Sequence, residues 1–135
     1  MDVQIFALCD AATAHAGKIF MLGVFDQIFA ANAPIVAPPC SLAVRIRFER
    51  IEEGNKTLRI QFVDADGRQI LPNLDANVAV RGQPNVSSSS VQIVLAIPQL
   101  VLPRFGEYAV DLAVDGRVEK SIPLYATQIV PQQAQ

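Results

Sequence analysis

"RFGEYAVDLAVDGR", residues 104–117, alternates between apolar and acidic side chains, and this alternation decides the fold class. Successive side chains of a β-strand point to opposite faces, so the pattern predicts a half-buried strand. Its apolar face is formed by Tyr108, Val110, Leu112 and Val114, and its acidic face by Glu107, Asp111 and Asp115. Acids four residues apart on a strand are separated by about 13 Å, whereas the carboxylates of glycosidases lie about 5–9.5 Å apart. We therefore interpret the acidic face as solvated.

Both ends of this strand carry turn signals. The entry Gly106-Glu107-Tyr108 resembles the tyrosine corner of Greek-key sandwiches, in which the hydroxyl bonds the backbone a few residues upstream. Asp115-Gly116 predicts a tight hairpin turn into the last strand. Pro123 interrupts that last strand, and because proline cannot donate to a sheet we expect an edge strand or a bulge there.

Two further alternating stretches, "SLAVRIRFER" (residues 41–50) and "TLRIQFV" (residues 57–63), predict half-buried antiparallel strands. Both place their apolar residues at even positions. If the two strands pair with these residues on one face, the loop between them must have an odd number of residues, and a three-residue loop at 53–55 would join them as a hairpin. That register predicts Phe48 opposite Ile60 in the core and Glu49 opposite Arg59 outside. Arg45, Arg47 and Arg59 would then form one solvated row.

The rest of the chain adds further strands separated by turn signals. Asp66-Gly67 predicts a turn, the polar stretch 83–90 predicts a loop that leads into the strand 91–97, and the proline-rich stretch 32–40 predicts an extended loop. We count about eight strands and no convincing helix. The sequence thus predicts an all-β, antiparallel β-sandwich, immunoglobulin-like or jelly-roll-like, as a single domain over residues 1–129 with a flexible tail at 130–135.

Composition limits the function. Of the 135 residues, 51% are apolar and only 18% are charged, against about 25% charged in an ordinary domain. The excess of apolar residues favours self-association, with a homodimer as the simplest form. The net charge of −2 and the lack of clustered Lys and Arg argue against binding to nucleic acid.

The first third of the chain is apolar on both faces. "VQIFALCDAA" (residues 3–12) and "KIFMLGVFDQIFA" (residues 18–30) flank the turn signal "AHAG". One interpretation is a hairpin at the centre of a sheet, covered on both sides; the other is a hairpin whose outer face meets a second chain. On the second interpretation, the interface residues are Phe6, Leu8, Phe20, Leu22 and Phe25.

The two cysteines and the N-terminus indicate the compartment. Cys9 and Cys40 are expected to be free, buried thiols rather than a metal site or a disulfide. The N-terminal stretch has no basic region and too short an apolar run for a signal peptide, and no segment is long enough to cross a membrane. We expect a cytoplasmic protein with no membrane partner.

No motif indicates an enzyme. There is one histidine, His15, and no nucleotide-binding or nucleophile-elbow motif, so we assign no catalytic, cofactor or metal residue. Cys9 is better explained as a core thiol than as a nucleophile. The leading hypothesis is a non-enzymatic interaction or structural module that self-associates. The alternative is a sandwich that binds carbohydrate, lipid or metal through the loops at 64–75 and 32–39, since Asp64, Asp66 and Asp75 lie there.

The stretches "FALCDAAT", "GKIFMLGVFDQI", "LAVRIRFERIEEG" and "FGEYAVDLAVDGR" together resemble a family of small bacterial proteins of this length. The resemblance covers nearly the whole chain. It implies a single β-rich domain, and it implies no activity, cofactor or catalytic residue.

Overall fold

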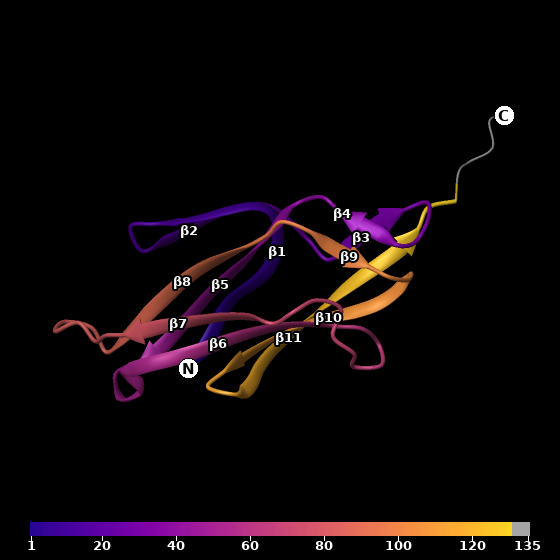
Figure 1. Cartoon of the computed structure of the whole chain (residues 1–135). Helices are drawn as coiled ribbons and strands as arrows, with labels where there is room; N and C mark the ends of the chain where they lie inside the picture. Colours follow the sequence, from indigo (N-terminus) through magenta and orange to yellow (C-terminus); the bar gives the residue numbers. More distant parts are fainter. Residues whose placement is uncertain (131–135) are drawn as a thin grey trace.

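The protein is built from β-strands, as a computed structural model that describes residues 1–130 shows (Figure 1). The strands are β1 (Asp2–His15), β2 (Lys18–Phe25), β3 (Gln27–Ala30), β4 (Ile35–Ala37), β5 (Cys40–Glu49), β6 (Gly54–Val63), β7 (Leu74–Val80), β8 (Ser88–Ile97), β9 (Leu100–Leu102), β10 (Gly106–Val114) and β11 (Arg117–Gln128). A single 3-10 turn, η1 (Arg50–Glu52), is the only helical element in this range. The prediction of an all-β fold is therefore confirmed. Within residues 1–130 no helix is long and apolar enough to cross a membrane.

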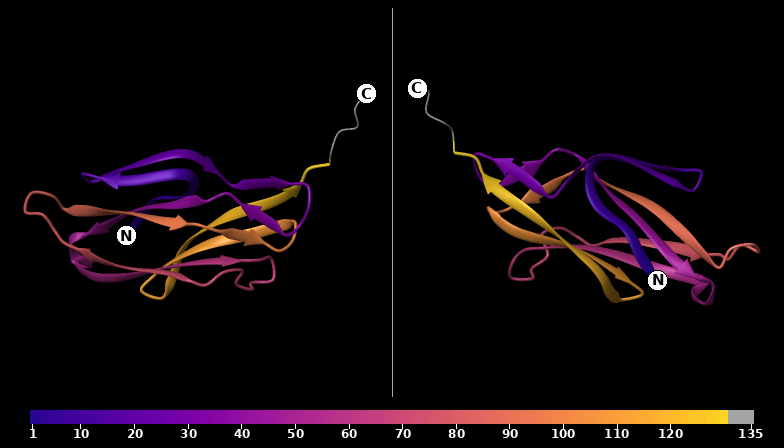
Figure 2. Two further views of the ribbon diagram at one scale, coloured as in Figure 1. Left: turned by 45° about the horizontal axis from the view of Figure 1, so that its top comes forward. Right: turned by 180° about the vertical axis from the view of Figure 1, so that it is seen from behind.

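The strands form two main sheets and one small one. The first has the order β2-β1-β5-β8, the second the order β3-β11-β10-β6-β7, and β4 pairs with β9. All pairings are antiparallel except that of β3 with β11, which is parallel and ties an early segment to the last strand (Figure 2). The four-stranded and five-stranded sheets pack against each other over one core.

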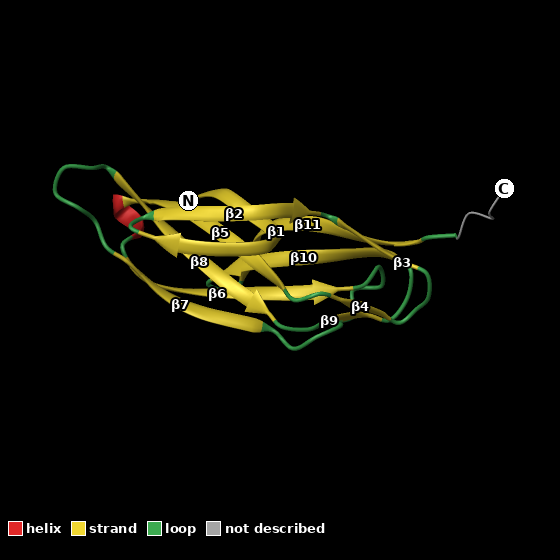
Figure 3. Ribbon diagram, turned by 90° about the horizontal axis from the view of Figure 1, so that it is seen from above, coloured by secondary structure: helices red, strands yellow, loops and turns green. Residues whose placement is uncertain are grey.

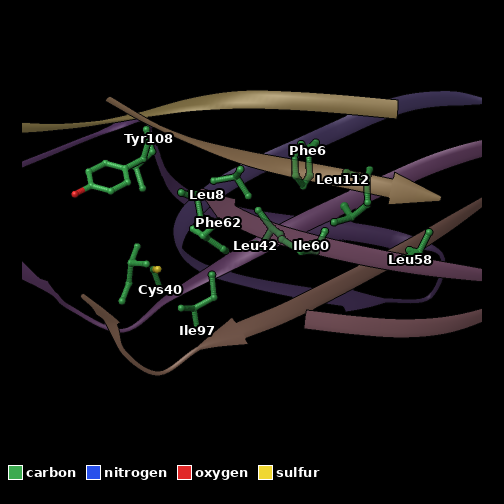
Figure 4. Packing of buried hydrophobic residues seen from close by; sticks show 14 of the residues in the cluster. Phe6, Leu8, Cys40, Leu42, Leu58, Ile60, Phe62, Ile97, Tyr108 and Leu112 are labelled. Atoms are coloured by element: carbon green, nitrogen blue, oxygen red, sulfur yellow. The ribbon is translucent and has the colours of Figure 1, made fainter. Parts of the chain in front are cut away.

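The core is filled by the faces that the alternation predicts. In β5, Leu42, Val44, Ile46 and Phe48 are each no more than 1% exposed, and the even-numbered residues of β6 and β10 oppose them from the other sheet (Figure 4). The acidic positions of β10 lie on the other face, as expected. The alternation in the sequence therefore predicted the inward face of the long central strands correctly. This face is strongly specified, because a shift of the strand by one residue would turn all its apolar side chains to the outside.

The predicted hairpin between β5 and β6 is wrong. β5 pairs with β1 and β8, whereas β6 pairs with β10 and β7, so the two strands lie in different sheets. The link between them is η1, in which the Glu52 side chain accepts a hydrogen bond from the backbone N–H of Glu49. This turn carries the chain from one sheet to the other instead of reversing it within a sheet.

The residue pairs that depended on that hairpin change accordingly. Phe48 faces Ser89, and Arg59 faces Asp75, with its Nε 2.9 Å from the Asp75 Oδ1. Arg45 and Arg47 lie on the first sheet and Arg59 on the second, so the predicted single row of arginines does not exist.

Short strands account for the difference between about eight predicted strands and the eleven observed in the described part of the chain. β3, β4 and β9 have three or four residues each, too few to show a period. β4 lies inside the predicted proline-rich loop. The serines at 88–90 are already part of β8, where they pair with the end of β5, whereas the prediction began this strand at residue 91.

The last hairpin matches the sequence analysis closely. The Tyr108 hydroxyl donates to the Arg104 carbonyl at 2.7 Å and accepts from the Arg104 N–H at 3.1 Å, which confirms the predicted link to the upstream backbone. Asp115 and Gly116, with φ of 49° and 83°, form the turn. Pro123 of β11 pairs with Ala109 of β10 on one side. On its other side, β3 pairs with β11 only from Tyr125 onward, so Pro123 lies on a sheet edge, as predicted. The predicted flexible tail lies, from residue 131 onward, outside the described residues.

Candidate functional site

The hairpin of β1 and β2 forms an arm, which we define as residues 10–24. The first half of β1 pairs with β5, and its second half pairs with β2, so one continuous strand joins the arm to the body. Ala16 and Gly17, with φ of 52° and 72°, make the turn at the tip. β2 lies at the margin of its sheet, so the prediction of a hairpin at a sheet centre is wrong.

The arm doubles back over the outer face of the four-stranded sheet (Figures 1 and 3). Arg45, on β5, donates from Nη1 to the Gly17 carbonyl at 3.3 Å and from Nε to the Gln4 side chain at 3.0 Å. One arginine of the body thus touches the tip of the arm. Near the base of the arm, Gly23 has a φ of 72°, and a Cβ added at this position would overlap the Asp10 carboxylate.

Large apolar side chains of β2 are exposed. The exposed fractions are 51% for Phe20, 38% for Met21, 72% for Leu22 and 59% for Val24. Three of them, Phe20, Met21 and Leu22, border a shallow apolar groove on the arm together with Ala11, Ala12 and Thr13 of β1. These four side chains carry no charged group and no strong hydrogen-bonding group, so polar contacts within the described chain do not account for their exposure.

The five residues predicted as an interface therefore fall into two groups. Phe6 and Leu8 are 8% and 0% exposed and belong to the core of the chain itself. Phe25 is partly buried against that core. Phe20 and Leu22 are on the exposed arm. Sequence reasoning missed Met21 and Val24, although they lie in the same apolar run; the run gave no sign of which members the chain would cover.

The two cysteines are free and buried, as predicted. The Cys9 Sγ lies 3.6 Å from the Ser41 carbonyl oxygen. Burial raises the pKa of the Cys9 thiol, with a smaller effect from Asp10, and burial likewise raises the pKa of the Cys40 thiol. Both thiols therefore stay protonated at neutral pH, which makes them poor nucleophiles and poor metal ligands.

We predict that both thiols react slowly with a maleimide in native buffer at pH 8 and rapidly once the protein is unfolded, as measured by mass spectrometry over time. The raised pKa also makes stability depend on pH. Because the folded state holds the thiol protons more tightly, the free energy of unfolding should fall as the pH rises above 9.0. A variant with Cys9→Ala and Cys40→Ala should lose part of that fall. Rapid labelling of the folded protein would contradict the burial.

A hollow of about 520 Å³, lined by both polar and apolar side chains, lies on the outer face of β10 and β11. It is lined by side chains that include Asp64, Glu107, Ser121 and Tyr125. The Asp64 carboxylate accepts hydrogen bonds from the backbone N–H groups of Asp66 and Arg68, both at 2.9 Å, and these bonds lower its pKa, that of Arg68 most strongly. Asp64 is thus an ionised turn residue, in agreement with the turn that Asp66-Gly67 predicts.

The other candidate residues are dispersed. Asp75 pairs with Arg59 on β6 and β7 and does not line the hollow around Asp64. No group of three His, Cys, Asp or Glu side chains within residues 1–130 is arranged to hold a metal ion. His15 is exposed at the tip of the arm, whereas Cys9 is fully buried.

The family of unknown function DUF6941 matches residues 4–127, nearly the whole described chain. No curated protein matches. The match agrees with the resemblance seen in the sequence, and it assigns no activity. The chain belongs to the DUF6941 family.

Proposed function

We propose that the protein is a non-enzymatic interaction module that self-associates through the arm. The observation that carries this proposal is the exposure of four large apolar side chains in succession along one sheet margin, Phe20, Met21, Leu22 and Val24. Isolated apolar residues on a surface are ordinary, but a contiguous group on one element favours an interface.

The physical character of β2 supports this proposal. Its only charged residue is Lys18, at the first position, and no acidic residue or proline interrupts it. Natural proteins protect exposed sheet margins with charges, prolines or bulges, because an open margin pairs with other chains. Beyond Lys18 at its start, β2 has no charge and no proline. Burial of its exposed side chains would remove apolar surface from water, at about 25 cal/mol per Å².

Light scattering coupled to size exclusion tests the proposal on the unmodified chain. We expect a dimer that dissociates on dilution, and a shift toward monomer when Leu22 is replaced by asparagine. The matched control is Val36→Asn, because Val36 is 61% exposed but lies on β4, away from the arm. A monomer at every concentration would overturn the proposal.

A second candidate is binding of a small polar ligand such as a carbohydrate in the hollow on β10 and β11. It is favoured by the ring of Tyr125, which is 39% exposed beside the carboxylates of Asp64 and Glu107, because sugars bind to aromatic faces flanked by hydrogen-bonding groups. The predicted loop at 32–39 does not line this hollow. A glycan array with the unmodified chain and with Tyr125→Ala tests this candidate, and a blank array would eliminate carbohydrate.

We also infer an immunoglobulin-like topology and a reducing compartment. The parallel pairing of β3 with β11 and the hydroxyl link from Tyr108 support the first inference. Two free, buried thiols support the second, since oxidising compartments favour disulfides.

A further inference from the structure

We propose that two copies of the chain pair edge to edge through β2, antiparallel, with Leu22 opposite Leu22 of the second copy. This inference rests on the proposed self-association and specifies its geometry. The margin of β2 is available for it, because within residues 1–130 β2 pairs with β1 alone. In Figure 1 the arm lies at the outer boundary of the molecule.

The exposure of β2 alternates in the way that such a pairing needs. Phe20, Leu22 and Val24 occupy alternate positions and are the three most exposed apolar side chains of the strand. Residues directly opposite in an antiparallel pair point to the same face. Along an antiparallel pair, the numbers of two directly opposite residues add up to a constant sum. An even sum sets the even-numbered, exposed residues of one copy opposite those of the other, so that they form one continuous face. An odd sum would set the exposed residues of each copy opposite the less exposed ones.

Among the even registers, a sum of 44 matches side chains and charges best. It places Phe20 opposite Val24 of the second copy and Leu22 opposite itself on the two-fold axis. An aromatic residue facing a β-branched residue is a favourable cross-strand pair. The same register places Lys18 opposite Asp26 of the second copy, at both ends of the pair.

The charges at these ends are free to make that contact. Both Lys18 and Asp26 are exposed, and neither side chain forms an ion pair within the described residues. Lys18 is the first residue of β2 and Asp26 directly follows its last, so an antiparallel pair brings Lys18 of each copy to the end of the strand where Asp26 of the other copy lies. A parallel pairing in register would instead bring the two Lys18 ammonium groups together, so charge selects the antiparallel arrangement.

Engineered cysteines test the register, since the native thiols are buried. Leu22→Cys should form a disulfide-linked dimer under mild oxidation, because opposite residues have Cα atoms about 4.5–5.5 Å apart, within disulfide reach. Phe20→Cys alone and Val24→Cys alone should not, because each lies about 13 Å along the strand from its own copy. An equal mixture of those two variants should form the mixed dimer. Circular dichroism confirms that each variant is folded.

Charge exchange provides an independent readout. Lys18→Glu and Asp26→Lys should each weaken the dimer by roughly fivefold to twentyfold, and the double variant should restore it. Cross-linking of Phe20→Cys alone would overturn the register, because it requires either an antiparallel pair centred on residue 20 or a parallel pair in register. A dimer in light scattering with no Leu22→Cys cross-link would overturn this inference and leave self-association standing, whereas a monomer would overturn both.

Discussion

Leu112→Ala is expected to lower the free energy of unfolding by about 2–5 kcal/mol. Leu112 is fully buried near the middle of β10, between Ile60 of β6 and Lys120 of β11. Removing its side-chain carbons loses burial of apolar surface and leaves a cavity that central, hydrogen-bonded strands cannot close. Urea unfolding followed by circular dichroism measures the effect, since the chain has no tryptophan.

The matched control makes the same chemical change on the arm. Leu22→Ala removes an equal number of atoms from a side chain that is 72% exposed, so it should change the free energy of unfolding of the monomer by no more than about 0.5 kcal/mol. The comparison belongs at a concentration where the protein is monomeric, because association adds to apparent stability. Self-association should respond in the opposite order, with a loss in Leu22→Ala and none in Leu112→Ala. Equal destabilisation by both would contradict the assignment of Leu22 to a surface.

Gly23→Ala is expected to displace the arm. The backbone of Gly23 has a φ of 72°, which costs an L-residue about 1–2 kcal/mol. A Cβ at this position would also overlap the Asp10 carboxylate. Amide hydrogen exchange should therefore be roughly tenfold or more faster in the arm and unchanged in the core strands. Dimer formation should weaken in parallel.

Two further variants separate the causes. Gly17 has the same φ of 72°, but a Cβ there would meet no atom within 4 Å, so Gly17→Ala reports the backbone cost alone. Adding Asp10→Ala to Gly23→Ala should bring the effect closer to that of Gly17→Ala, because the carboxylate is removed while the Cβ of residue 10 stays 3.1 Å away. If Gly23→Ala and Gly17→Ala behave alike from the start, contact with Asp10 has no part in fixing the arm.

The sequence predicted local features well and long-range pairing poorly. The period of two identified the inward faces of β5, β6 and β10, and the Gly-Glu-Tyr entry correctly indicated the hydroxyl link of Tyr108. However, the period says which face is buried and not which strand lies alongside. "IEEGNK" fits a hairpin loop as well as it fits a crossing between sheets, so Phe48 and Arg59 were given the wrong partners. Strands as short as β4 have no period to detect.

Only part of the candidate site could be predicted, because the sequence pattern does not show which other segments pack against the apolar run. An apolar run shows that side chains need cover, but it does not show whether the chain itself supplies that cover. Phe6 and Phe20 look alike in sequence, and only the bend of β1 separates them, placing Phe6 in the core and Phe20 on the arm. One signal in the sequence, Gly23, could have indicated the arm. A glycine inside an apolar strand often marks a position that another group approaches closely.

The edge position of Pro123 has a consequence for how far any assembly can grow. Along 117–124, β11 forms a margin of the five-stranded sheet and carries Glu119, Lys120 and Pro123, so a strand added there would meet charges and lose a hydrogen-bond donor. In the four-stranded sheet, the proposed two-fold pair uses the free edge of β2 in both copies, so neither copy keeps an open β2 edge. Fibre growth needs a margin that remains open after each addition. The charges and Pro123 at one margin, and the proposed two-fold pair at another, would together keep both of these margins from adding further chains.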